Sequence, residues 1–175
     1  MRVGAFPDPD EELDEGGLRR ALTRRIEAAV WLTSPALAAR QTTEALHVTA
    51  EIDEALRDID HGAWTGSTFE AVQANDPVGL AAWLANPARG APGGESLADV
   101  RARLAPWLQR HAHARSPAVV AITHPMVIRA ALAEALDMPS AAVLRIDIAP
   151  LAAVSLSFNR LWRLQAIRPD KEAAP

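Results

Sequence analysis

Short apolar runs and longer amphipathic segments alternate along most of this chain. The run AAVWL at residues 28–32 and the run at residues 117–123 are typical of buried parallel strands, and residues 48–52 are a third candidate. Strands that alternate with helices predict an α/β fold, a three-layer sandwich in which helices flank a mainly parallel sheet. We expect residues 28–32 and 118–122 to be buried in that sheet.

Helices are predicted where apolar residues recur every three or four positions. Ser34 suits the N-cap, and Pro35 the first helical position, of a helix that follows the first run. The stripe formed by Leu97, Val100, Leu104 and Leu108 indicates another helix. The remaining helices are expected over residues 18–26, 125–136 and, in two pieces broken near Asn75 and Pro77, 68–85.

The last third of the chain shows the two-residue period of strands. Apolar residues alternate with polar ones over 144–148 and again over 154–158, and Asn159-Arg160 is a plausible hairpin turn into 161–167. The length of 175 residues fits one domain. We therefore expect a single domain over residues 1–175, with an irregular N-terminal segment at 1–17 and a flexible tail at 168–175.

Composition narrows the class of protein. Apolar residues make up 49% of the chain, which is typical of a folded globular protein. The net charge of −4, with no basic stripe, argues against nucleic acid as a partner. Without cysteine the chain has neither a disulfide scaffold nor a thiolate zinc site. The sequence shows no apolar stretch of about 18 residues and no signal-peptide pattern, so we expect no membrane partner and a cytoplasmic location.

His124 lies where the apolar run at 117–123 gives way to a helix. Ligands of α/β sheets collect beyond the carboxyl ends of the strands, and free N–H groups in the first turn of a helix attract phosphate. A histidine at this position could donate to a phosphate oxygen. The alternative is a histidine that caps the helix or packs in the core, and position alone does not choose between the two.

Four stretches of the sequence occur in an order that is informative. They are TSPALAARQTTEAL at 33–46, ALRDIDHGAWTG at 55–66, PGGESLADV at 92–100 and AITHPMVIRAAL at 121–132. Each stretch alone is a weak signal. In this order and at these spacings they resemble the histidine phosphatase superfamily, the phosphoglycerate mutase-like proteins, over about residues 13–163.

The resemblance implies a phosphoglycerate mutase-like fold and phosphoryl transfer through a phosphohistidine, with no metal or other cofactor. Members of the family use the histidine of an Arg-His-Gly motif, at the end of the first strand, as the nucleophile. A second histidine and two arginines clamp the phosphate, because guanidinium groups bind its oxygens in pairs. A glutamate protonates the leaving oxygen.

The family's site residues carry over to four positions of this chain. His124 matches the second histidine, and Asp58 matches the acid with one methylene fewer, so both are candidate catalytic residues. For Asp58 the alternative is a solvated carboxylate in a turn. His61 falls where the family often has an aromatic residue, and Glu95 lies in the family's Gly-Gly-Glu-Ser turn, so both are candidate substrate-binding residues.

The chain departs from the family at two places. Ala38 stands where the helix carries a clamp arginine, and Arg40 is about 200° away around that helix, so we expect it to point elsewhere. No Arg-His-Gly occurs, and no histidine precedes His47. The segment Leu13-Asp14-Glu15-Gly16-Gly17 resembles the entry to the first helix, which comes after the motif in the family.

We therefore expect the chain as given to lack the central first strand and the nucleophile. Either the true start lies upstream of Met1, or the protein is a natural pseudoenzyme. A third idea makes RVGAF, residues 2–6, a degenerate first strand and Asp8 the nucleophile, although aspartyl-phosphate chemistry normally needs Mg²⁺ and further carboxylates. The family places its first strand between the two runs near residues 30 and 120, so its absence leaves a gap or lets those strands close up.

These observations predict a histidine phosphatase family protein, ancestrally a phosphomonoesterase or phosphoryl transferase, that is weak or inactive as this chain stands. The alternatives are a non-catalytic protein that binds a phosphate ligand and an N-terminally truncated active phosphatase. The expected partner is a small phosphorylated molecule or inorganic phosphate, and a homodimer is left open.

Overall fold

Three short parallel strands form the sheet that carries the predicted site. The computed structural model describes residues 4–23, 26, 28, 30–112 and 118–169. Within them, β1 (Val30–Thr33) lies between β2 (Glu51–Ile52) and β3 (Val119–Ile122). β1 and β3 pair directly, from Val30 opposite Val119 to Thr33 opposite Ile122. The predicted parallel sheet is confirmed, and β1 and β3 are direct neighbours in it.

The RVGAF segment does not enter this sheet. Residues 1–3 lie outside the described residues, and Gly4 adopts a positive φ of 82°. Ala5 forms an isolated antiparallel bridge with Thr68, and the N–H of Phe6 donates to the carbonyl of Ser67. The idea of a degenerate first strand is therefore wrong for the described part of the segment, because its backbone pairs with the loop before residue 69.

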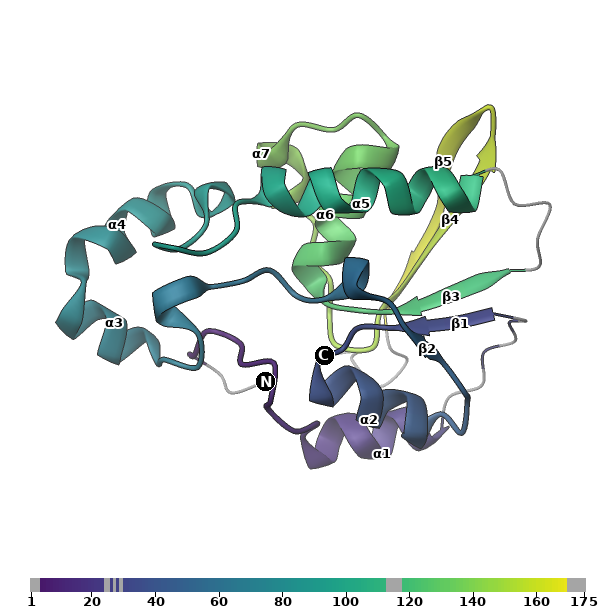
Figure 1. Cartoon of the computed structure of the whole chain (residues 1–175), viewed down its shortest axis with the longest axis horizontal. Helices are drawn as coiled ribbons and strands as arrows, with labels where there is room; N and C mark the ends of the chain where they lie inside the picture. The colour runs from purple at the N-terminus through teal and green to yellow at the C-terminus, as the bar shows by residue number, and fades with distance from the viewer. Residues whose placement is uncertain (1–3, 24–25, 27, 29, 113–117, 170–175) are drawn as a thin grey trace.

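Helices flank the sheet on two sides (Figure 1). In that view α5 (Leu97–Ala112) and α6 (Pro125–Ala135) lie above it, and α1 (Glu15–Thr23) and α2 (Leu37–Ala45) lie below. The three-layer α/β prediction is confirmed. The helix predicted over 18–26 begins and ends three residues earlier. Among the described residues, no helix has the length and apolar character needed to cross a membrane.

The main apolar cluster lies beside the sheet. It joins the buried stripe of α5 to α6 and to α7 (Ser140–Val143), with β4 (Ala153–Asn159) packed against it through Val154 and Leu156. The stripe predicted for α5, Leu97, Val100, Leu104 and Leu108, is buried as expected. The expectation that both strands are buried is only partly met. Val30 is 38% exposed, and every residue of β3 is half-buried.

Two local predictions are wrong. Ser34 is not the N-cap of α2, which begins at Leu37 after Ala36; its Oγ accepts from the N–H of Ala36, before the helix, and also contacts His124. Residues 144–148 are not a strand: α7 ends at Val143, and turn hydrogen bonds continue to Ile146, whose carbonyl accepts from Arg129 Nε at 2.9 Å. Burial still alternates along this segment, which is why the sequence pattern suggested a strand.

A smaller lobe carries α3 (Phe69–Asn75) and α4 (Pro77–Ala85), and it lies to the left in Figure 1. The predicted break falls at Asp76, whose side chain accepts from the N–H of Gly79 and caps α4. The lobe is held by aromatic rings that lie about Phe6, with centroids 4.7–5.3 Å from it: those of His61, Trp64, Phe69 and Trp83. The short 3-10 helices η2 (Gly62–Trp64) and η3 (Pro87–Arg89) connect it to the rest.

The chain ends are irregular at the start and paired near the end. Between residues 4 and 14 the backbone forms turns and the single bridge at Ala5, and the carbonyl of Pro9 accepts from the N–H of Leu37 at the start of α2. The predicted hairpin is confirmed: β4 pairs antiparallel with β5 (Leu161–Arg168) in a separate sheet, and Arg160 in the turn has φ 62°. The tail beyond residue 169 lies outside the described residues.

Candidate functional site

His124 follows β3 directly and is the N-cap of α6, with the extended backbone angles φ −116° and ψ 157°. Pro125 occupies the first helical position, where a backbone N–H would have no partner within the helix. Its missing N–H therefore costs no helical hydrogen bond, and the helix can begin directly after the strand. The imidazole is 17% exposed. Its Nε2 lies 2.8 Å from Ser34 Oγ, and its Nδ1 lies 3.4 Å from Asp58 Oδ2.

Ser34 reaches His124 because the two strands that precede them pair directly. Thr33 lies opposite Ile122, and the N–H of Ser34 donates to the carbonyl of Ile122 at 2.9 Å. Parallel strands end at the same edge of a sheet, so the residues after both strands meet there. Ser34 is fully buried, and its Oγ also accepts from the N–H of Ala36 at 3.2 Å.

Asp58 approaches the same edge from the loop after the 3-10 helix η1 (Glu54–Leu56). Its Oδ1 accepts from the N–H of Ile59 at 2.8 Å, which leaves Oδ2 facing His124. A carboxylate that is ionised only accepts hydrogen bonds, so a neutral His124 that donates to Asp58 would carry its proton on Nδ1, and its Nε2 would then accept from the Ser34 hydroxyl. The structure thus brings His124 and Asp58 together with Ser34, and we call these three residues the histidine site.

The start of α6 adds positive potential to the histidine site. The first N–H groups of an α-helix have no partner within the helix and favour an anion. Pro125 removes one of these donors, which leaves those of Met126 and Val127 in the first turn. A protonated imidazole beside them would present two further N–H donors. The arrangement can therefore hold an oxyanion such as phosphate.

His61 belongs to the group of rings around Phe6 in the smaller lobe. Its side chain is buried, and its ring centroid is 5.1 Å from that of Phe6. Burial lowers the pKa of His61, and the negative charges of Asp58 and Asp60 oppose that effect. A contact between His61 and a substrate stays a prediction. In the structure the ring packs against the ring of Phe6.

Glu95 is held by two arginines. Its carboxylate accepts from Arg57 Nη1 and Nη2 at 2.8 and 2.7 Å and from Arg103 Nε at 3.1 Å, and Oε2 also accepts from the N–H of Asp60 at 3.1 Å. Burial opposes the charge of Glu95, but the hydrogen bonds from Arg103, Arg57 and Asp60 outweigh it and place its pKa below the ordinary value. We call Arg57, Glu95 and Arg103 the arginine–glutamate cluster. Its use as a substrate contact stays a prediction.

The sequence of residues 8–166 matches the model of the histidine phosphatase superfamily (branch 1). The chain belongs to this superfamily. It is 32% identical over 141 residues to the bifunctional protein Rv2228c of Mycobacterium tuberculosis, a match that covers 78% of this chain and 38% of that protein. The chain therefore spans well under half the length of this curated relative.

Solved structures of phosphatases have the same fold. The mycobacterial glucosyl-3-phosphoglycerate phosphatase Rv2419c in complex with VO3 has a TM-score of 0.78 and 26% identity, over 93% of this chain and 90% of that one. The same protein with inorganic phosphate has a TM-score of 0.80 and 23% identity, over 99% and 95% of the two chains.

The other positions weighed in the sequence are Ala38, Arg40 and Asp8. Ala38 is half-buried in the first turn of α2, and Arg40 on the same helix is exposed. Asp8 is exposed, and its Oδ1 accepts from the N–H of Asp10 at 2.9 Å. Within the described residues, no three His, Asp or Glu side chains are placed to share a metal ion.

A separate hollow of about 470 Å³ lies between α2 and the segment leading into α1. None of the residues matched to superfamily site positions lines it, and two glutamates on its border make it a poor place for phosphate. We therefore keep the histidine site as the candidate. The residues around the hollow are Glu12, Leu13, Leu18, Gln41, Glu44 and Ala45.

Sequence reasoning missed three residues around the histidine site. Ser34 was assigned to helix capping, although its place at the end of a strand parallel to that of His124 was a usable signal. Arg103 and Thr123 were not considered, and both donate to carbonyl groups of the segment that carries Asp58. Contacts of a side chain with a distant backbone leave no pattern in the sequence.

Proposed function

We propose that this chain binds the phosphate group of a small phosphoester, or inorganic phosphate, at the histidine site and turns it over weakly or not at all. The observation that carries the proposal is the chain of contacts from Ser34 through His124 to Asp58 at the first turn of α6. The phosphatase of the same fold that is solved with inorganic phosphate and with VO3 supports an anion of this kind.

In this proposal His124 donates to a phosphate oxygen from Nδ1, the nitrogen that now faces Asp58. The contact with Asp58 is long, at 3.4 Å, whereas that with Ser34 is 2.8 Å. A phosphate oxygen can therefore replace the weaker partner while Ser34 keeps the ring oriented. Asp58, displaced by a small movement and having taken up a proton from solvent, would be placed to give that proton to a leaving oxygen.

Weak turnover is proposed because two catalytic groups of the superfamily, the nucleophilic histidine and one phosphate-binding arginine, have no counterpart at the matched positions of this sequence. The 175 residues contain no Arg-His pair at the end of a first strand, and Ala38 replaces a clamp arginine. Without the nucleophile the covalent route through phosphohistidine is lost. Losing one charge-stabilising donor commonly costs about 10²–10³ in rate. The direct pairing of β1 with β3 also lets Ser34 fill the space beside His124 Nε2.

The test uses the purified 175-residue chain, with inorganic phosphate and orthovanadate as probes. We expect calorimetry to detect binding that His124→Ala weakens by roughly tenfold or more, the loss expected for one charge-assisted hydrogen bond, and p-nitrophenyl phosphate to be hydrolysed little or not at all. His47→Asn is the matched control, because His47 is exposed, lies two residues beyond the far end of α2, and has a positive φ of 55° that asparagine tolerates. Failure to bind either anion would overturn the proposal. Brisk hydrolysis that His124→Ala abolishes would overturn its statement on turnover.

An active phosphatase is the second candidate, in which residues outside these 175 supply the Arg-His-Gly strand. The lead-in Leu13-Asp14-Glu15-Gly16-Gly17 favours it, because this segment resembles the helix entry that comes after the motif in the superfamily. Codons upstream of Met1 decide the matter: an in-frame strand ending in Arg-His, added back to the protein, should restore hydrolysis. An in-frame stop codon would leave only the first proposal.

A further inference from the structure

We infer that Arg103 and Thr123 are positioning residues for Asp58: together they hold the backbone of residues 55–58 so that the Asp58 carboxylate faces His124. The orientation of Asp58 towards His124 is a property of the protein without a ligand. Its meaning for phosphate chemistry rests on the proposed function.

Side chains bind four successive carbonyl groups of this segment. Arg103 Nη1 donates to the carbonyl of Ala55, and Thr123 Oγ1 donates to that of Leu56 at 2.7 Å. Arg103 Nη2 donates to the carbonyls of Arg57 and Asp58 at 2.8 and 3.1 Å. Each backbone carbonyl is a strong acceptor, so four in succession that are held by only two side chains are a specific restraint on the backbone.

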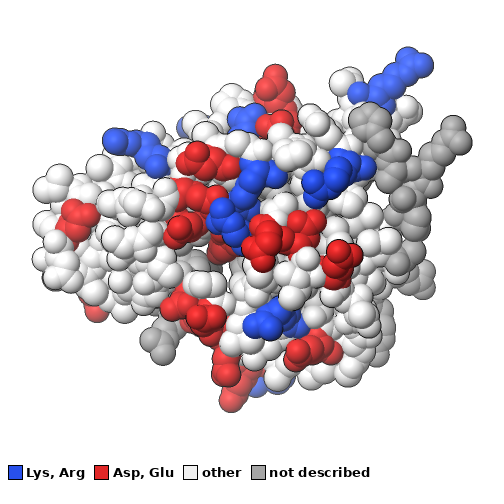
Figure 2. All heavy atoms as spheres, in the orientation of Figure 1, with Lys and Arg blue, Asp and Glu red and all other residues white. Residues whose placement is uncertain are grey.

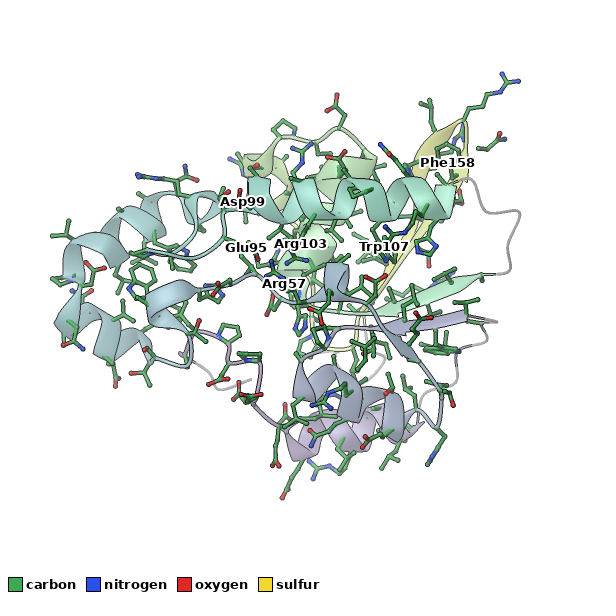
Figure 3. The ribbon with its side chains drawn as sticks, viewed as in Figure 1. Arg57, Glu95, Asp99, Arg103, Trp107 and Phe158 are labelled. Carbon is green, nitrogen blue, oxygen red and sulfur yellow. The ribbon has the colours of Figure 1, made fainter. Side chains whose placement is uncertain are left out.

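Glu95 fixes the fork of Arg103. It accepts from Arg103 Nε at 3.1 Å, and the two side chains are only 15% and 16% exposed. Figure 3 shows Arg103 projecting from α5 towards Glu95 and Arg57. In the same view, Figure 2 shows basic and acidic side chains side by side at the centre of this face. The guanidinium plane offers five donors in a rigid geometry, which a lysine could not reproduce.

This restraint decides which way Asp58 points. Arg57 has the polyproline-II-like angles φ −56° and ψ 152°, and this conformation has three residues per turn, so the side chains of Arg57 and Asp58 leave the backbone in different directions. Arg57 meets Glu95, and Asp58 meets His124. Thr123 precedes His124 in the chain, so its bond to Leu56 ties the Asp58 segment to the same strand end that carries the histidine.

The experiment reads the tautomer of His124 in the ligand-free protein. Ring ¹⁵N shifts, recorded about two pH units above the ordinary histidine pKa, distinguish a proton on Nδ1 from one on Nε2. We expect the wild type to hold the Nδ1–H form that Asp58 selects. Arg103→Met should lower the ratio of Nδ1–H to Nε2–H by roughly 3- to 10-fold, the range expected when the Asp58 carboxylate no longer faces Nδ1.

Arg101→Met is the matched control, because Arg101 lies on the same helix and pairs with Glu134 at 3.3 Å instead. Thr123→Val, which removes only the hydroxyl, should shift the ratio in the same direction, and Thr123→Ser should restore it. This second pair keeps the inference testable if Arg103→Met does not fold. An unchanged tautomer ratio in folded Arg103→Met, or in Thr123→Val, would overturn the inference.

The outcomes also separate this inference from the proposed function. If the wild type binds no phosphate but the tautomer responds to Arg103 and Thr123, the positioning role stands and the proposed function fails. If phosphate binds and the tautomer does not respond, the proposed function stands and the positioning role fails.

Discussion

The arginine–glutamate cluster and the histidine site lie on either side of one short backbone segment, and they are built differently. In the cluster the Glu95 carboxylate has charged donors at 2.7–3.4 Å, three of them at 3.1 Å or less, and these bonds lower the pKa of Glu95. In the histidine site one contact is short and the other, between His124 and Asp58, is 3.4 Å long. The short bonds between the arginines and Glu95 hold the backbone in place. The long contact between His124 and Asp58 can instead be replaced by a contact between His124 and a ligand.

The charged residues on the two sides of this segment therefore divide into two groups. Glu95 and Arg103 act on the backbone, and their charges are satisfied within the protein. His124 and Asp58 meet at the end of the sheet, beside a helix N-terminus that favours an anion. A substitution in the first region should change mainly the stability of the fold, and one in the second should change mainly the binding of a ligand.

The largest effect on stability is expected for Glu95→Gln. The change leaves Arg57 and Arg103 without their carboxylate partner, and removing one member of a buried ion pair costs about 3–5 kcal/mol. Because Arg57 is 40% exposed, water compensates in part, and we expect a loss of about 2 kcal/mol in the free energy of unfolding. Urea denaturation at neutral pH measures it.

Glu15→Gln is the control for Glu95→Gln. Glu15 pairs with Arg19 on the exposed face of α1 at 3.8 Å, and such surface pairs contribute about 0.5 kcal/mol or less. Equal losses for the two variants would show that the arginine–glutamate cluster is no more than a surface ion pair, and the contrast between the two regions would disappear.

The sequence predicts more of the fold than of the site. The stripe of α5 and the strand-to-helix change at His124 followed from local patterns, because each element buries a periodic set of side chains. The assignment of Ser34 to an N-cap was locally reasonable, but the pairing of β1 with β3 gave its hydroxyl another partner. Arg103 contacts backbone groups 45–48 residues away, which no periodicity encodes.

The second prediction concerns the histidine site itself: Asp58→Asn should strengthen the binding of inorganic phosphate. A carboxylate beside the bound anion repels it, and at a partly exposed site a neighbouring charge is worth about 1 kcal/mol, or roughly fivefold in affinity. Asparagine keeps an acceptor for His124 Nδ1, so the ring should stay in place. Calorimetric titration with phosphate at constant ionic strength measures the change.

Asp137→Asn is the matched control for charge. Asp137 lies just beyond the opposite end of α6 from His124, and asparagine tolerates its positive φ of 51°. We expect its phosphate affinity to equal that of the wild type. Weaker binding in Asp58→Asn would mean that Asp58 supports the anion instead of competing with it for His124.

The smallest effect is expected for the pH dependence of stability contributed by His61. Burial lowers the pKa of His61 below the ordinary value of 6.5, so the unfolded chain takes up a proton at a higher pH than the folded one. The stability that depends on a neutral His61 is therefore complete above about pH 6.5 and is lost as the pH falls below that value. His61→Phe removes the titrating group and keeps a ring against Phe6.

We expect His61→Phe to flatten, but not abolish, the fall in the free energy of unfolding below pH 6.5. The pKa of His111, which stacks on Trp107 at a centroid distance of 4.3 Å, is also lowered by burial and contributes in the same direction. Urea denaturation at a series of pH values gives the slopes of the variant and of the wild type. A His61→Phe slope equal to that of the wild type would mean that the ring of His61 is solvated when charged and is available to a ligand, as the sequence motif suggested.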